Sequence, residues 1–388
     1  MAPGTEGILE RASRIAIVRA LLDLLDGKTT TRAETAVELD AERYVDPARF
    51  AHERRRLFLE FPQVVGLSCD LPDPGSWSCL DVAGVPVLLV RGEDGAFRAF
   101  INACRHRGAR VAEGCGHGSR FVCPWHSWTY DDHGRLAGLP DRASFEALRL
   151  DHRALTPLAA HERYGLLLVL PTPGRNFDPE DVLRGIGPQI DAFALGSMHR
   201  VDTREVRIPA NWKLAVDTGI EVYHVAFLHK DSVGPRNIGN TQTFETFGLH
   251  QRMAIPAPSI LSLHDLPERE WGDPMQHFQL VHNLFPSTGL VIASELVALT
   301  RAEPGSHVGE TAFRFSTYSW HRPVTEQDQN AARLGFEGLY HVVSNEDFRV
   351  AAQAQKSFEA ERGRSVLIGR NEIGIQALHR SYDALLGS

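Results

Sequence analysis

One short stretch, residues 104–128, constrains this chain more than any other part of the sequence. It reads CRHRGARVAEGCGHGSRFVCPWHSW and holds three cysteines and three histidines in 25 residues. Thiolates and imidazoles suit zinc, copper or iron–sulfur centres better than magnesium or calcium. The whole chain has five cysteines, an odd number that cannot pair completely in disulfides. The clustering therefore predicts a metal centre.

Spacing separates the candidate ligands from their neighbours. Four residues form two tight pairs with sixteen residues between the pairs: Cys104 and His106, then Cys123 and His126. Sixteen residues suffice for a strand, a turn and a returning strand, so the two pairs can meet at adjacent hairpin tips. Only five residues separate His117 from the second pair, which is too few for such a return. We therefore expect Cys115 and His117 in the glycine-rich connecting turn.

A second group of metal-binding residue types lies in RIPANWKLAVDTGIEVYHVAFLHK. Four of them fall within 13 residues: Asp217, Glu221, His224 and His229. Two imidazoles and one carboxylate on one face of an iron ion leave positions open for dioxygen and substrate. The step from His224 to His229 turns roughly 500° along a helix, about 140° off register, so a straight helix cannot aim both at one ion. We expect a helix end or a bulge between Val225 and Leu228.

The first pattern resembles the Rieske arrangement, in which two cysteines hold one iron of a [2Fe-2S] cluster and two histidines hold the other. Together, the two stretches resemble the catalytic α subunit of the Rieske non-heme iron oxygenases, also called aromatic ring-hydroxylating oxygenases. In that family the second stretch reads N-W-K, then an acidic residue, two residues, His, four residues and His. The matching residues here are Asn211, Trp212, Lys213, Glu221, His224 and His229.

The resemblance implies a role for each site residue. The [2Fe-2S] ligands would be Cys104, His106, Cys123 and His126. A mononuclear Fe(II) would be held by His224, His229 and Asp347, with Glu346 as the alternative to Asp347 in the sequence "NED". Glu221 would link the two metal centres as an electron bridge. Asp217 is either a supporting partner of the iron site or an acid on the helix surface.

The expected fold class is α+β. The resemblance implies a small all-β Rieske [2Fe-2S] domain and a larger catalytic domain with an antiparallel sheet covered by helices. We place a helical N-terminal extension at 1–44, the Rieske domain with its leading helix at 45–170, and the catalytic mononuclear iron domain at 171–388. The tetrapeptide GEDG at 92–95 predicts a hairpin turn, and residues 278–304 and 311–320 predict strands.

Four further helices are expected from the sequence. An amphipathic helix should cover residues 8–26, because apolar residues recur there at helical spacing between charged ones. Residues 179–193 should form a second helix, a long helix should run through Leu367, and a last one should lie within residues 369–386. The substrate pocket should be lined by residues 230–300, including 239–250 and 255–266.

The resemblance implies a terminal oxygenase component. It would use reductase-supplied electrons and O2 to hydroxylate or oxidatively demethylate a small aromatic or alicyclic substrate, a role in aromatic hydrocarbon catabolism. No GxGxxG follows a predicted strand, so NAD(P)H would act through a separate reductase, directly or through a ferredoxin. One alternative is a Rieske electron-transfer protein without a functional mononuclear iron site, and another is a zinc-stabilised binding module.

Charge and hydropathy narrow the expected partners. The net charge is −8 and the pI is about 6.1, which argues against a nucleic-acid surface. No apolar run approaches the ~18 residues of a membrane span. Charged residues interrupt the N-terminal apolar stretch, so we expect no signal peptide and a cytoplasmic protein. The family resemblance implies a homotrimer, arranged head to tail as a closed ring.

Overall fold

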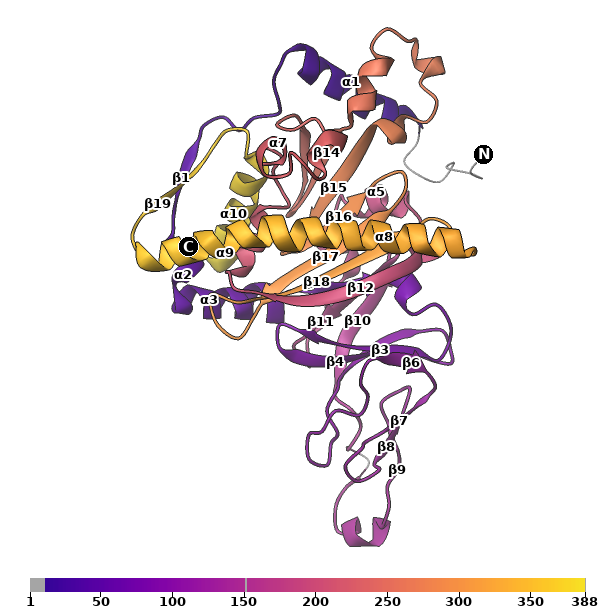
Figure 1. The fold of residues 1–388 in the computed structure, drawn as a ribbon. Coiled ribbons are helices and arrows are strands. Elements are labelled where there is room, and N and C mark those ends of the chain that lie inside the picture. Colours follow the sequence, from indigo (N-terminus) through magenta and orange to yellow (C-terminus); the bar gives the residue numbers. More distant parts are fainter. Residues whose placement is uncertain (1–10, 151, 388) are drawn as a thin grey trace. The chain divides into compact units, whose positions relative to one another are not determined.

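The computed structural model describes residues 11–150 and 152–387. These residues form two compact units (Figure 1). The smaller unit contains Arg55–Leu183 and Leu195–Ser197, and the larger unit takes the rest of the described chain. The smaller unit is built on β-strands, and the larger one on an antiparallel sheet with helices. The predicted α+β class is confirmed.

The unit boundaries differ from the predicted ones at both ends of the smaller unit. It begins at Arg55, where we expected residue 45, and it ends at Leu183, where we expected residue 170. The expected N-terminal extension is part of the larger unit. The N-terminal segment belongs to the larger unit because its strand β1 (Val37–Asp40) pairs with strand β19 (Ser365–Ile368).

A seven-stranded antiparallel sheet organises the smaller unit. Its strand order is β2-β11-β10-β5-β4-β3-β6. The strands are β2 (Gln63–Leu67), β3 (Ser76–Val82), β4 (Val85–Arg91), β5 (Phe97–Ile101), β6 (Cys115–His117), β10 (Pro157–Arg163) and β11 (Leu166–Leu170). The GEDG tetrapeptide joins β4 to β5, as predicted. The run LLLVL of β11 is buried at every position.

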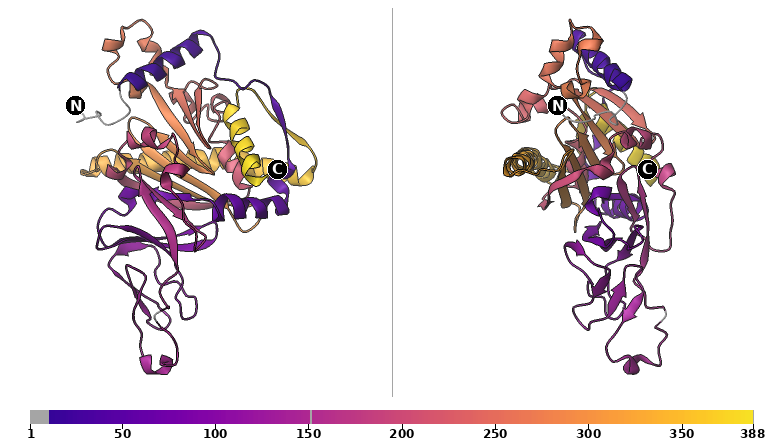
Figure 2. Two further views of the ribbon diagram at one scale, coloured as in Figure 1. Left: turned by 180° about the vertical axis from the view of Figure 1, so that it is seen from behind. Right: turned by 90° about the vertical axis from the view of Figure 1, so that its right-hand side faces the viewer.

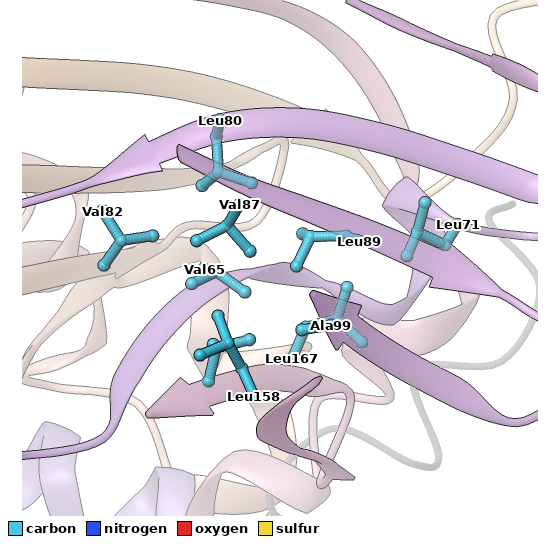
Figure 3. Packing of buried hydrophobic residues seen from close by; sticks show 10 residues of the cluster. Val65, Leu71, Leu80, Val82, Val87, Leu89, Ala99, Leu158 and Leu167 are labelled. Atoms are coloured by element: carbon cyan, nitrogen blue, oxygen red, sulfur yellow. The ribbon is translucent and has the colours of Figure 1, made fainter. Parts of the chain in front are cut away.

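Alternating side chains of these strands form the core of the smaller unit. Figure 3 shows Leu80, Val87 and Val65 pointing toward one another between the strands. Each of these side chains is at most 6% exposed. Burial of a side chain of this size contributes about 1.5–3 kcal/mol. Hydrophobic burial thus stabilises the seven-stranded sheet of the smaller unit.

A second sheet of the smaller unit contains β7 (Arg120–Val122), β8 (Thr129–Asp131) and β9 (Leu136–Gly138) in the order β7-β8-β9. Strand β7 lies where the returning strand was expected. Residues 115–117, however, form strand β6, so the prediction of a turn there was wrong. Backbone pairing with β3, such as His117 opposite Ser76, holds these three exposed residues extended.

A second seven-stranded antiparallel sheet organises the larger unit, in the order β12-β18-β17-β16-β15-β14-β13. The strands are β12 (His199–Ile208), β13 (Thr243–Phe247), β14 (His250–Pro256), β15 (Phe278–Leu284), β16 (Thr288–Ile292), β17 (Val297–Pro304) and β18 (Thr311–Ser319). Strands β15 to β18 confirm the two predicted strand regions. Successive side chains alternate between the two faces, so the register fixes which residues share a face.

A long helical rod lies across this sheet and consists of three segments. These are α8 (Glu326–Val342), the π-helical turn η10 (Val343–Asp347) and α9 (Phe348–Ala360). Figures 1 and 2 show the rod running past the strands, beside one face of the sheet. The expected continuation through Leu367 was wrong. The rod ends at Ala360, because residues 365–368 pair with β1 instead.

The remaining helices of the described chain are short, apart from the first and the last. Helix α1 (Arg11–Asp26) and helix α10 (Ile373–Leu386) agree with the prediction, although residues 8–10 lie outside the described residues. The expected helix 179–193 is divided into α4 (Pro179–Val182) and α5 (Gly187–Asp191). Gly185 lies between them with φ +80°, outside the helical region. None of the described helices is long and apolar enough to cross a membrane.

The N-terminal segment of the larger unit adds α2 (Glu42–Val45) and α3 (Pro47–Glu53), followed in the smaller unit by the π-helix η2 (Arg54–Leu59). Glu53 at the end of α3 is fully buried and pairs with the fully buried Lys213. The indole Nε1 of Trp212 also donates to Glu53, at 3.1 Å. Burial lowers the pKa of Lys213 although Glu53 opposes the shift. The pair therefore fastens α3 to the segment that follows β12.

We expect Lys213→Met to lower the free energy of unfolding of the larger unit by about 3 kcal/mol, because it leaves the Glu53 carboxylate buried without its main counter-charge. Urea unfolding followed by circular dichroism measures the change. Arg314→Met serves as control, since its partner Glu205 is 65% exposed and the pair should contribute less than about 1 kcal/mol. Equal losses in the two variants would contradict this assignment.

Candidate metal centres

The segment that carries the predicted iron ligands begins at helix α6 (Trp212–Asp217). Asn211 caps this helix, because its side-chain oxygen accepts a hydrogen bond from Lys213 N at 3.0 Å. The backbone N–H of Asn211 in turn donates to Gln355 Oε1 on α9, at 2.9 Å. The N-W-K residues therefore fix the start of this segment against the rod.

His224 and His229 flank a single helical turn, α7 (Val225–Leu228). We expected a helix end or a bulge between Val225 and Leu228, and the helix end is confirmed, because α7 ends at Leu228. His229 has φ −98° and ψ 18°, outside the α-helical region. This departure brings the two imidazoles together, with ring centroids 4.9 Å apart.

Three predicted iron ligands converge in the larger unit. The Nε2 atoms of His224 and His229 lie 3.2 Å apart. Asp347 Oδ1 lies 3.2 Å from His229 Nε2 and 3.6 Å from His224 Nε2. Among the described residues this buried oxygen has no hydrogen-bond partner of good geometry. Two imidazole nitrogens and a buried carboxylate oxygen that face one point suit a divalent metal ion.

A carboxylate contacts the Nδ1 atom of each imidazole, while Nε2 faces the candidate metal position. Glu221 contacts His224 Nδ1 and also accepts from the backbone N–H of His224 at 3.2 Å. Glu346 Oε2 lies 2.7 Å from His229 Nδ1 and accepts from Ser232 Oγ at 2.9 Å. A carboxylate at Nδ1 places the proton there and leaves Nε2 free to bind a metal.

The π-helical turn η10 places Glu346 and Asp347 at the site. A π-turn holds one residue more than an α-turn, and such turns are frequent at functional sites. Here the two consecutive carboxylates reach opposite nitrogens of the same imidazole, that of His229. Phe348 follows directly and packs edge-on against Phe313 of the sheet at 4.7 Å. The geometry thus favours Asp347 over Glu346 as the third ligand, and the supporting role of Glu346 was missed from the sequence.

The charge environment of His229 also reflects this arrangement. Burial lowers the pKa of its imidazole, but the carboxylates of Asp347 and Glu346 outweigh this effect and raise the pKa to about 8. The two carboxylates therefore favour positive charge at the centre.

Asp217 lies apart from the candidate iron ligands. It is buried and accepts a hydrogen bond from Tyr44 OH at 2.8 Å, with His379 Nε2 3.2 Å away. Its described contacts connect α6 to α2 and α10 and include no bond to His224 or His229. Asp217 is thus neither a surface acid nor a direct partner of the imidazoles, and it anchors the helix that precedes them.

A cavity of about 540 Å³ reaches the candidate metal centre. His224, His229 and Asp347 line it together with residues of strands β15 to β18. The expected contribution of residues 239–250 was wrong, because β13 and the turn after it lie away from the cavity, at the far edge of the sheet. Ile255 and Ala257 of the expected stretch 255–266 line the cavity, and so do strand residues between Phe278 and Thr300, as predicted.

The predicted cluster ligands lie in the smaller unit. Cys104 and Cys123 are buried in one apolar cluster with Trp128 and Tyr130. Tyr130 OH accepts from the backbone N–H of Arg105 at 2.9 Å and lies 3.3 Å from Cys104 Sγ, which it can reach as a donor. By contrast, Cys115 is exposed.

The two histidines of the cluster site lie next to each other in an edge-to-face arrangement, with ring centroids 4.6 Å apart. His106 stacks on Trp128 at 5.0 Å, and His126 stacks on Trp125 at 5.0 Å. Within the described residues, His126 Nδ1 is buried and has no hydrogen-bond partner. A buried imidazole nitrogen without a partner, beside two buried thiols, fits a bound iron–sulfur cluster.

The site and fold define a protein with one Rieske-type cluster site and one candidate mononuclear metal site. Comparison with known families agrees. Residues 61–153 match the Rieske [2Fe-2S] domain, and residues 195–388 match the ring-hydroxylating α subunit (catalytic domain). This chain belongs to the ring-hydroxylating α subunits of the Rieske oxygenase family. Members of this family carry a [2Fe-2S] cluster and a mononuclear iron, and the donor groups described above fit both.

The individual relatives share only a modest sequence identity with this chain. The glycine betaine monooxygenase oxygenase subunit of Chromohalobacter salexigens is 32% identical over 192 residues, which cover 48% of this chain and 42% of that protein. This chain therefore spans less than half the length of that relative. The salicylate 5-hydroxylase large oxygenase component of a Ralstonia species is 25% identical over 80% of this chain and 82% of that protein.

Solved structures share the fold at lower identity. A quaternary ammonium Rieske monooxygenase superposes with a TM-score of 0.76 at 21% identity and covers 90% of this chain and 96% of that one. At this identity the likeness establishes the fold alone.

Proposed function

We propose that this chain is the terminal oxygenase component of a Rieske system. It uses electrons supplied by a reductase, and O2, to hydroxylate or oxidatively demethylate a small organic substrate. The observation that carries this proposal is the cavity that opens onto His224, His229 and Asp347. A pure electron carrier needs no such cavity beside a second metal site.

The geometry supports a role for each residue in this proposal. Cys104, His106, Cys123 and His126 would hold the [2Fe-2S] cluster, and His224, His229 and Asp347 would hold the iron. When bound, the cluster supplies one-electron transfer and the iron supplies dioxygen activation. Glu221 and Glu346 orient the two imidazoles and keep their Nδ1 protons in place. The apolar walls of the cavity bind the substrate and displace water from the centre.

The chain assembles, in this proposal, as a head-to-tail homotrimer in the cytoplasm. Glu221 would then accept a hydrogen bond from a cluster histidine of the neighbouring chain and bridge the two centres. Exposed aromatic side chains beside Glu221 support a docking surface, since Tyr223 is 48% and Phe227 68% exposed. A related quaternary ammonium Rieske monooxygenase is described as transferring electrons between subunits. None of the five cysteines forms a disulfide in the described part of the chain, which suits a reducing compartment.

The substrate, in this proposal, is a small molecule with an aromatic or alicyclic body. Four phenylalanines contribute to the cavity walls: Phe278, Phe313, Phe315 and Phe348. The names of the relatives cover both glycine betaine and salicylate, so both kinds of substrate belong in a test. Substrate-dependent NAD(P)H and O2 consumption with a surrogate reductase tests the proposal over a panel that includes both. A colourless protein without iron would overturn it.

Removal of an iron ligand should lower the iron content without affecting the cluster. We expect Asp347→Asn and His224→Ala to bind about two irons per chain, against about three for the unaltered protein, while the visible spectrum of the cluster is unchanged. Iron analysis by mass spectrometry measures this. Asp231→Asn, at a side chain 88% exposed, is the control. About two irons in the unaltered protein would instead support an electron carrier.

Glu221→Gln should retain the cluster spectrum and reduce turnover by about 100-fold, because an amide cannot hold the His224 Nδ1 proton as a carboxylate does. Single-turnover kinetics of the pre-reduced enzyme and steady-state O2 uptake measure the effect. The control Glu361→Gln changes a carboxylate that is 70% exposed. Undiminished turnover would contradict the bridging role.

Tyr130→Phe should lower the reduction potential of the cluster, because a hydrogen bond from Tyr130 to Cys104 Sγ stabilises the more negative, reduced cluster. Burial and the contact with Cys104 raise the pKa of Tyr130, so the hydroxyl keeps its proton. Redox titration followed by electron paramagnetic resonance measures the shift. Tyr164→Phe, which removes an exposed hydroxyl bound to Glu180, should leave the potential unchanged.

A further inference from the structure

One face of the seven-stranded sheet of the larger unit forms the floor of the cavity. The register of the strands identifies which side chains lie on this face. Asn283 of β15 pairs with Gly289 of β16, which pairs with Thr300 of β17. These three residues line the cavity in one row across the strands. Because Gly289 has no side chain, the hydroxyl of Thr300 lies over it, 2.5 Å from where a Cβ would stand, and the amide of Asn283 is the other polar group of the row.

Asn283 is the unusual member of this row. It is 2% exposed, and among the described residues its Nδ2 has no hydrogen-bond partner. A buried amide N–H without a partner costs about 1–3 kcal/mol. Thr300, by comparison, donates to the carbonyl of Gly289 at 3.4 Å. A ligand in the cavity that accepts a hydrogen bond from Asn283 would remove this cost.

The charges around the cavity indicate what kind of acceptor fits. Apart from the candidate iron ligands, the charged residues among the described lining are Glu221, Arg236 and Glu295. Glu221 is bound to His224, while Arg236 and Glu295 are exposed. No buried cation is therefore available along the described lining to pair with a carboxylate on the substrate, and burying an unpaired carboxylate is costly. A quaternary ammonium group has no acceptor and would leave Asn283 unpaired.

We propose that Asn283 determines substrate specificity by donating a hydrogen bond to a neutral acceptor, a carbonyl or ether oxygen, on an otherwise apolar substrate. This inference rests on the proposed function in that it takes the cavity as the substrate site. It narrows the substrate to a neutral oxygen-bearing compound whose acceptor lies over the row formed by Asn283, Gly289 and Thr300.

Three probes of similar size test the proposal by direct binding to the holoenzyme in calorimetry. They are 1-indanone, which carries a carbonyl, indane, which lacks it, and phenyltrimethylammonium, which carries a cation. We expect 1-indanone to bind about fivefold more tightly than indane, equivalent to about 1 kcal/mol. Asn283→Leu should abolish this preference by weakening 1-indanone alone. Asn283→Ala, which introduces no bulk, should do the same if the leucine variant fails to fold.

Gln251→Leu is the matched control. Gln251 lies directly opposite Asn283 on β14, is also buried, and has an Oε1 atom without a partner among the described residues, but it does not line the cavity. It should keep the preference for 1-indanone. If Gln251→Leu also lost the preference for 1-indanone over indane, the proposal would be overturned. The preference would then depend on hydrogen bonding of Asn283 within the sheet and not on a bond from Asn283 to the ligand.

Two further outcomes would overturn the proposal. One is an unchanged preference in both Asn283 variants. The other is tighter binding of phenyltrimethylammonium than of 1-indanone, or no binding of 1-indanone at all. Oxygen uptake and product analysis are measured separately. A carbonyl preference that depends on Asn283, without any oxygenated product, would refute the proposed oxygenase activity and leave the binding assignment intact.

Discussion

The hydrogen bonds between two carboxylates and two imidazoles are the interaction on which the candidate iron site depends. Glu221 and Glu346 each hold one imidazole by Nδ1, which turns both Nε2 atoms toward Asp347. Neither histidine lies within a long helix, so the backbone alone does not fix their orientation. The carboxylates supply that orientation, and one of them comes from a helix far away in the sequence.

The rest of the larger unit holds these elements in register. The cap at Asn211 and its bond from Gln355 connect the histidine segment to the rod that carries Asp347. The buried pair of Glu53 and Lys213 connects the same segment to the N-terminal helices. Asp217 adds a third connection through Tyr44 and His379. Asn211, Lys213 and Asp217, which lie close to the candidate iron ligands in the sequence, therefore position the segment that carries the ligands.

Much of this arrangement could be predicted from the sequence, because ligand types and spacings are local. The pairs at 104–106 and 123–126 and the strand β7 before the second pair are of this kind. The role of Glu346 could not be predicted, since it depends on a π-helical turn that the pattern of residues 341–360 does not reveal. The end of the rod was missed for another reason. Residues 365–368 are extended only because a strand more than 300 residues earlier pairs with them.

The π-helical turn also affects where the rod tolerates a change of chain length. Because a π-turn holds one residue more than an α-turn, deleting one residue from Val343–Asp347 would restore an α-helix and leave α8 and α9 close to their present phase. Gln355 would then keep its contact with Asn211, whereas Glu346 and Asp347 would no longer reach opposite nitrogens of the same imidazole. A deletion from the regular part of the rod before Gln355 would instead rotate the part that follows by about 100°.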